Sequence, residues 1–174
     1  GAYVVFTGAD TPAVADVAQE KGKYGVTYDW YGSCKVERCL TAPYWLWGTE
    51  YARITEGIIA GTYVPGYDYF DAETGALGLY GFMEGQELTT GLKDLDPEVI
   101  AMVKDLLAKM QAGEFTRFDV FSGPINDNKG NVVLPEGQSL EQVDLDAFPE
   151  FGLPCSVSVC MKWWAEGITA ELPE

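Results

Sequence analysis

Short apolar runs alternate with helical patterns through the first two-thirds of the chain, and this order constrains the fold more than any other feature. Residues 2–7 are apolar, β-branched or aromatic, which predicts a buried strand. Apolar side chains then recur at helical spacing over residues 13–18, and Gly22 ends that helix. A second strand is predicted over residues 24–28. Strand, helix and strand in this order predict an α/β fold with a mostly parallel sheet flanked by helices.

The remaining elements are predicted from apolar spacing and from residues that start or stop helices. A helix over residues 48–60 carries its apolar side chains on one face and ends at Gly61. The clearest helix starts at Asp96 and Pro97 and runs to residue 110. Further strands are predicted at residues 40–45, 77–82, 118–125 and 132–134, with a short helix at 139–148. Residues 126–131 lack the full spacing of a calcium-binding loop and are predicted to form a hairpin turn.

Acidic residues dominate the charge of the chain. Asp and Glu total 27 against 11 Lys and Arg, which gives a formal net charge of −16. This charge repels phosphate backbones and anionic membranes, so nucleic acid is not expected as a partner. The chain has no histidine, which excludes Ser-His-Asp and Cys-His catalytic arrangements and histidine-liganded zinc. No apolar run reaches the roughly 18 residues that a membrane-spanning helix requires.

The four cysteines form two pairs of identical spacing, Cys34 with Cys39 and Cys155 with Cys160. Local pairs in an even number favour two short disulfides in an oxidising compartment. The alternative is a four-thiolate metal site, although such zinc sites use two-residue gaps on at least one side. Pairing between the two distant pairs stays open. Disulfides are the preferred interpretation, and no metal or cofactor is expected.

Polar and aromatic side chains follow the predicted strands, at the edge where parallel α/β sheets bind ligands. They are Asp10 and Thr11 after the first strand, Asp29 and Trp30 after the second, Trp45 and Trp47 after the third, and Glu84 after the fourth. Indole rings stack on flat aromatic molecules, and carboxylates accept hydrogen bonds from amines or ribose hydroxyls. This edge is therefore predicted to bind a flat aromatic ligand with hydrogen-bond donors.

Each of these residues also has a purely structural interpretation. Residues 10–12 are placed to cap the helix that follows them. Asp29 at a strand end is also compatible with a solvated turn, and Glu84 with an exposed loop. Trp45 and Trp47 alternate, so in an extended segment they point to opposite faces, one to the core and one to the ligand. Trp47 is preferred as the residue that faces the ligand.

Several stretches of the chain resemble the basic membrane protein family of ABC-transporter substrate-binding proteins. In chain order they are FTGADTPA at 6–13, KYGVTYD at 23–29, LT at 40–41, WLWG at 45–48, MEG at 83–85, FSGPI at 121–125 and LPEGQ at 134–138. The resemblance lies in their order and spacing and not in any single motif. Trp30 stands where relatives often carry a small or acidic residue, and the two cysteine pairs are unusual for the family.

The resemblance implies a type I periplasmic-binding-protein-like fold, in which two α/β lobes joined by a hinge hold the ligand between them. It implies a purine nucleoside or nucleobase as ligand, an ABC-transporter permease as partner, and an extracytoplasmic, lipid-anchored full-length protein. The matched part corresponds to the C-terminal portion of such a protein, so the start of the chain is interpreted as processed or truncated. Residues 1–150 are expected to form its α/β portion, with residues 151–174 as an aromatic extension packed on it.

A transport receptor binds its ligand without chemistry, which agrees with the missing histidine, and we do not expect an enzyme. One alternative is a sensing or signalling domain of the same fold. The chain shows no basic recognition helix, and its cysteine pairs argue against the cytosol. Another alternative is an enzyme that uses Asp, Glu or Tyr, but no nucleophile is found beside a base.

Overall fold

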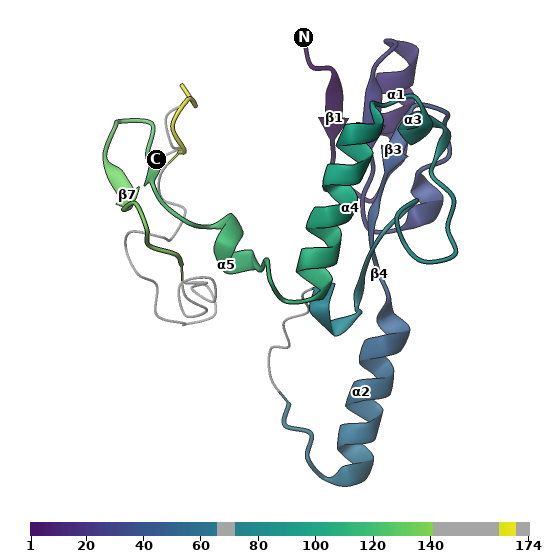
Figure 1. Cartoon of the computed structure of the whole chain (residues 1–174), viewed down its shortest axis with the longest axis vertical. Helices are drawn as coiled ribbons and strands as arrows, with labels where there is room; N and C mark the ends of the chain where they lie inside the picture. Colours follow the sequence, from purple (N-terminus) through teal and green to yellow (C-terminus); the bar gives the residue numbers. More distant parts are fainter. Residues whose placement is uncertain (66–71, 141–163, 170–174) are drawn as a thin grey trace. The chain divides into compact units, whose positions relative to one another are not determined.

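The beginning of the chain forms the predicted parallel β-α-β unit. The computed structural model describes residues 1–65, 72–140 and 164–169. The parallel sheet has the order β1 (Val4–Phe6), β2 (Tyr24–Val26), β3 (Cys39–Thr41), and α1 (Ala13–Glu20) connects β1 to β2 (Figure 1). The other elements are η1 (Tyr31–Ser33), β4 (Pro43–Trp45), α2 (Trp47–Ala60), η2 (Ala72–Thr74), β5 (Leu77–Leu79), α3 (Thr90–Lys93), α4 (Pro97–Gln111), α5 (Arg117–Val120), β6 (Ile125–Asn126) and β7 (Val132–Leu134). The α/β class is confirmed.

Helices pack on both faces of the parallel sheet. Tyr24 and Val26 of β2 join a buried apolar cluster with Leu92 and Ile100, which α3 and α4 supply. Side chains alternate along a strand, so Gly25 faces the opposite side, where α1 lies. A Cβ on Gly25 would lie 2.6 Å from the Cα of Ala15. The glycine therefore lets α1 approach the sheet at backbone distance.

β5, predicted as the fourth strand of a parallel sheet, departs from the parallel arrangement. β4 follows β3 after one residue, and β5 pairs with it antiparallel, with Trp45 opposite Leu77. The buried ring of Tyr44 lies against Gly78 in the middle of β5, where a side chain would collide with it. The prediction of a mostly parallel sheet therefore holds for three strands, while β5 runs the other way.

The predicted helix boundaries are largely confirmed. The Asp96 side chain accepts a hydrogen bond from the first turn of α4 at 2.9 Å, as expected for an N-cap. Gly61 and Gly113 follow α2 and α4 with φ of 69° and 70°, in the left-handed region that glycine adopts most readily.

The chain divides into two compact units, residues 1–114 and 115–174. In the second unit the strand predicted over residues 118–125 is wrong for most of its length. Thr116 and Asp119 form a reciprocal capping box that starts α5 instead, and only Ile125 remains in a strand. The hairpin of β6 and β7 is confirmed. Residues 141–148 of the predicted short helix, and the expected domain boundary at residue 150, lie outside the described residues.

Residues 164–169 are hydrogen-bonded to this hairpin. The Trp164 carbonyl accepts from the Asn128 backbone N–H at 2.7 Å, and the Glu166 N–H donates to the Asn126 carbonyl at 3.1 Å.

Across residues 1–65, 72–140 and 164–169, no helix has the length and apolar character needed to span a bilayer.

Candidate functional site

Asp29 follows β2 in a backbone conformation that side chains other than glycine rarely adopt. Its φ is 71°, and the Trp30 N–H donates to the Tyr28 carbonyl across it at 2.9 Å. An i to i+2 bond around a positive φ is a γ-turn, a strained conformation that asparagine and aspartate tolerate better than most residues. Asp29 also forms a parallel bridge with Tyr44. The turn therefore brings the end of β2 beside β4, and strain of this kind concentrates at functional sites.

The turn that follows is held by short-range bonds. The Ser33 hydroxyl donates to the Trp30 carbonyl at 2.6 Å, and the Ser33 N–H donates to the same oxygen at 3.0 Å. Gly32 lies under the Trp30 indole, where any side chain would collide with the ring. Trp30 and Tyr31 are nevertheless 54% and 49% exposed, so their rings remain available to a ligand.

Tyr31 lies at the centre of a cluster of aromatic rings, which we call the ring cluster: Trp30, Tyr31, Tyr44 and Tyr80. The Tyr31 centroid lies 5.5 Å from that of Tyr44, 5.7 Å from that of Tyr80 and 6.2 Å from that of Trp30. These are favourable distances for aromatic pairs. The Tyr44 hydroxyl also accepts from the Gln86 amide at 3.0 Å. Sequence reasoning missed Tyr31, Tyr44 and Tyr80, because they come from three separate segments that only the fold brings together.

Trp45 and Trp47 lie on the same side and not on opposite faces. Leu46 ends the extended segment, and Trp47 is the first residue of α2. The two indoles stack at 5.4 Å with an interplanar angle of 29°, and Tyr51 continues the stack at 6.2 Å from Trp47. The prediction of opposite faces is wrong because it assumed an extended backbone through Trp47. Trp47 is 47% exposed, so the stack borders solvent at the end of β4.

Asp10 and Thr11 lie in the loop after β1, at the same carboxyl edge of the parallel sheet as Asp29. The Thr11 hydroxyl accepts from the Ala13 N–H at 3.2 Å, although Pro12 and not Thr11 occupies the N-cap position. Asp10 is exposed. Within the described residues, no hydrogen bond, ion pair or ring contact joins Asp10 to Asp29 or to the tryptophans. The edge places these carboxylates at neighbouring strand ends, with no direct contact between them.

Glu84 lies away from Trp45. Because β5 is antiparallel to β4, its carboxyl end is beside Pro43 and not beside Trp45. Glu84 is exposed in a turn closed by the Gln86 N–H donating to the Met83 carbonyl at 3.0 Å. Expecting Glu84 at the shared edge assumed a parallel fourth strand. Tyr80 instead reaches the ring cluster from this segment.

The predicted local disulfide joins Cys34 to Cys39. Cys39 is completely buried at the start of β3, and the next residue after Cys34, Lys35, places its ammonium 5.4 Å from the Trp30 ring centroid. With these two sulfurs bonded to each other, they do not form half of a four-thiolate site. Cys155 and Cys160 lie outside the described residues. In the described part of the chain, no three His, Cys, Asp or Glu side chains are grouped to hold a metal ion.

We call the residues at and after the carboxyl ends of β1, β2 and β4 the aromatic edge: Asp10, Asp29, Trp30, Tyr31, Trp45 and Trp47. Most of this surface is exposed. Cavities of about 380, 480 and 610 Å³ occur in the described chain, and none is lined by the predicted ligand-binding residues. The cavity of about 480 Å³ adjoins the edge, since Cys34, Lys35 and Tyr80 line part of it. The cavity of about 610 Å³ is an apolar groove along β1 and α1.

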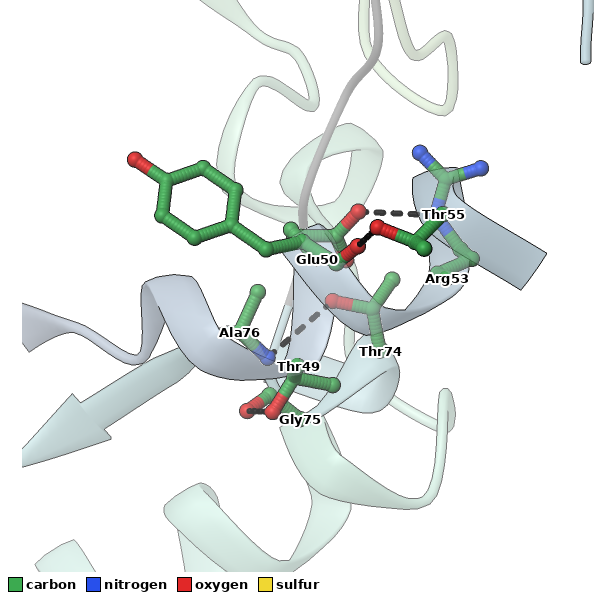
Figure 2. A network of polar contacts seen from close by, with 8 residues as sticks. Thr49, Glu50, Arg53, Thr55, Thr74, Gly75 and Ala76 are labelled. Carbon is green, nitrogen blue, oxygen red and sulfur yellow. Dashed lines mark hydrogen bonds and ion pairs between the residues drawn. The ribbon is translucent and has the colours of Figure 1, made fainter. Parts of the chain in front are cut away.

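A carboxylate is buried near the start of α2 (Figure 2). Glu50 is 1% exposed, and its Oε2 accepts from the Arg53 Nε at 2.7 Å, while its Oε1 has no hydrogen-bond partner. Beside it, the Thr49 hydroxyl donates to the Gly75 carbonyl at 3.4 Å. Glu50 is the buried residue of α2, whereas apolar Ile58 is exposed. Sequence reasoning missed this carboxylate, because helical spacing assigned the buried face of the helix to its apolar residues.

The turn of the second unit is a hydrogen-bonded loop around one carboxylate. Asp127 Oδ1 accepts from the N–H groups of Lys129 and Asn131, each at 2.8 Å, and Oδ2 accepts from the Asn131 side-chain amide at 2.8 Å. The bond from the Asn131 side chain is the main cause that lowers the pKa of Asp127. Both oxygens are engaged within the turn, which supports the hairpin interpretation over a calcium loop.

A scan against protein-family models finds no match to this chain, and a search of curated proteins finds no match either.

Proposed function

We propose that this chain is part of the substrate-binding component of an ABC importer of the basic-membrane-protein type, and that it binds a purine nucleoside or nucleobase. The observation that carries the proposal is the meeting of Asp29, Trp30 and Tyr31 with Tyr44 at the carboxyl edge of the sheet. Doubly wound α/β sheets bind ligands at this edge. The strained turn at Asp29 supports a functional role for that position.

The chemistry of the edge suits a flat heteroaromatic ring with donor groups. Trp30, Tyr31 and Trp47 each expose about half of their surface, and stacking of a base on such a ring contributes about 1–3 kcal/mol. The carboxylates of Asp29 and Asp10 accept hydrogen bonds from exocyclic amines or ribose hydroxyls. We propose that Asp29 and Asp10 make the polar contacts to the ligand. Stacking is proposed for Trp30, Trp45 and Trp47.

Because the aromatic edge is exposed, we infer that a second lobe of the receptor completes the binding site. A receptor of this kind closes two lobes over its ligand, and the ligand favours the closed form through contacts that are better there. The transporter permease then recognises the closed form. Binding and release suffice for this role, so no residue needs to act as acid, base or nucleophile. The same role places the protein outside the cytoplasm, where the Cys34–Cys39 disulfide is stable.

The outer edge of the sheet supports a position within a larger α/β protein. β1 is an edge strand of the described sheet, and Phe6 and Tyr3 are 74% and 61% exposed. The apolar groove between β1 and α1 continues this surface, with Val5, Val14 and Val17 among its lining residues. An uncovered apolar edge favours aggregation. We therefore propose that further segments of the receptor cover β1.

Isothermal titration calorimetry with adenosine, guanosine, inosine and adenine tests the proposal. The protein to be titrated is the longest product of the gene that contains this chain, called the two-lobed protein below. The 174-residue chain alone is titrated for comparison. We expect saturable one-to-one binding of at least one of these purines by the longer product, and weaker or no binding by the single chain. Mass spectrometry of ligand retained through purification identifies the natural compound. If the two-lobed protein gives no heat with any of the four and carries no purine, the purine assignment is refuted.

A further inference from the structure

The Cys34–Cys39 disulfide lies directly after the turn that carries Trp30 and Tyr31 of the ring cluster. Cys34 directly follows η1, and Cys39, which is completely buried, begins β3. Tyr31 lies three residues before Cys34, and its ring contacts Tyr44 and Tyr80. The disulfide therefore ties the turn that presents Tyr31 to β3, and one residue after β3 the chain enters β4, which carries Tyr44.

The hydrogen bonds within the turn do not connect it to β3. The bonds from Ser33 to the Trp30 carbonyl, and from the Cys34 N–H to the Tyr31 carbonyl at 3.1 Å, lie within the turn itself. They preserve its local shape, whereas the disulfide sets its position relative to β3. Without the bond, residues 35–38 would be the covalent connection from the turn to β3, while the Asp29–Tyr44 bridge would remain at the start of the turn. Two of residues 35–38, Lys35 and Glu37, are exposed.

The two sulfurs differ in their access to solvent. Cys34 and Lys35 line the cavity of about 480 Å³, whereas Cys39 is completely buried. Because Cys34 lines this cavity and Cys39 is buried, we expect a thiolate nucleophile to attack the Cys34 sulfur and not that of Cys39. The Cys39 sulfur lies 3.8 Å from the Thr27 hydroxyl and 3.7 Å from the Thr41 carbonyl oxygen. Those oxygens offer acceptors to a Cys39 thiol, so the reduced state leaves no unpaired buried donor.

We propose that this disulfide is a redox-controlled positioning element that holds Tyr31 in the ring cluster, so that reduction weakens ligand binding at the aromatic edge. The effect on binding rests on the proposed function. The reductant is a dithiol. Its first thiolate attacks the Cys34 sulfur, which breaks the disulfide and releases Cys39 as a thiol. Its second thiol displaces Cys34 from the mixed disulfide, so two electrons and two protons pass to the cysteines and the reductant becomes a disulfide.

The positioning is tested by NMR of the full chain with ring-labelled tyrosine, in a Cys155→Ser, Cys160→Ser background so that dithiothreitol acts only on the bond in question. Phe substitutions at Tyr31 and Tyr80 assign their signals. We expect both signals to shift on reduction and in a Cys34→Ser, Cys39→Ser variant, while that of Tyr51 on α2 stays unchanged as an internal control. Unchanged signals from Tyr31 and Tyr80 in the reduced protein overturn the proposal.

The effect on binding is tested by titrating adenosine into the oxidised and reduced two-lobed protein. Because each stacked ring contributes substantially to base binding, we expect the affinity to fall about 5-fold or more on reduction. In a Tyr31→Leu variant, reduction is expected to change nothing further, since the ring it acts through is gone. An equal loss in that variant overturns the proposal. If no purine binds in either redox state, the proposed function fails, and the tyrosine signals still decide whether the disulfide positions Tyr31.

Discussion

Asp29 offers the sharpest separation of structural and functional roles, because its backbone and its carboxylate can be altered independently. Its φ of 71° suits asparagine and glycine but not alanine. Asp29→Asn keeps the shape and the tolerance for this φ and removes the charge. Asp29→Gly keeps the turn and removes the side chain. Asp29→Ala loses both the carboxylate and the conformational tolerance.

The two roles predict different magnitudes. A backbone held in a sparsely populated conformation such as this γ-turn costs about 1–3 kcal/mol, so Asp29→Ala is expected to lower the free energy of unfolding by about 1 kcal/mol relative to Asp29→Asn. A hydrogen bond to a charged group contributes about 1.5–3 kcal/mol. If the carboxylate contacts the ligand, all three variants should therefore raise the Kd for the purine by about 10-fold or more.

Urea unfolding followed by tryptophan fluorescence measures the first effect, and calorimetry with the two-lobed protein measures the second. Asp94→Ala serves as the matched control, because Asp94 is exposed and has a φ of −82°. Equal stability of the Ala and Asn variants would refute the strained turn. Wild-type affinity in the Asn and Gly variants would show that Asp29 shapes the turn without contacting the ligand.

Three further predictions follow from single contacts. Trp47→Ala should weaken purine binding by about 1–3 kcal/mol by calorimetry, while Ile59→Ala, an exposed control on the same helix, should not; unaltered affinity places this indole outside the site. Gly25→Ala should lower the free energy of unfolding by about 1–3 kcal/mol, because its Cβ would overlap α1. Gly8→Ala, with open space around it, should change that free energy by no more than about 0.5 kcal/mol. Equal effects of the two substitutions would argue against a backbone contact between β2 and α1. Hydrogen bonds from the Thr116 backbone and hydroxyl lower the pKa of Asp119, so the capping box stabilises α5 at neutral pH and is lost as the pH falls through that lowered pKa. Asp119→Asn should therefore unfold at lower urea than wild type at pH 7 and match it once the pH lies below the pKa of Asp119; a difference that persists in acid contradicts this reasoning.

Elements governed by neighbouring residues were predictable from the sequence. The strands at β1 and β2, the helices α1, α2 and α4 and the glycines that follow them depend on apolar spacing and on backbone preference within a few positions. The Cys34–Cys39 disulfide belongs to the same class, because only four residues separate its partners. The prediction of a strand over residues 118–125 was wrong because it was based on apolar content and overlooked the Thr116–Asp119 capping box, which is a local signal for a helix start.

Residues of the candidate edge were predictable only where a parallel strand ends. Asp10 and Asp29 follow β1 and β2, and the parallel order of those strands places them at one edge. Trp45 and Trp47 were identified as aromatic, but their mutual stacking required the chain to turn into α2 after Leu46. Glu84 was misplaced because the direction of β5 depends on how a distant segment returns to β4, which periodicity does not encode.

The sequence by itself determined the β-α-β start and the acidic and histidine-free composition, and it favoured the local disulfide, since each depends on residues close together in the chain or on composition alone. Only the tertiary structure decided the antiparallel β5, the ring cluster around Tyr31 and the burial of Glu50. These features join segments tens of residues apart, and their pairing is set by packing and by backbone hydrogen bonds across the fold. A pattern of side chains along one segment carries no information about which distant segment will meet it.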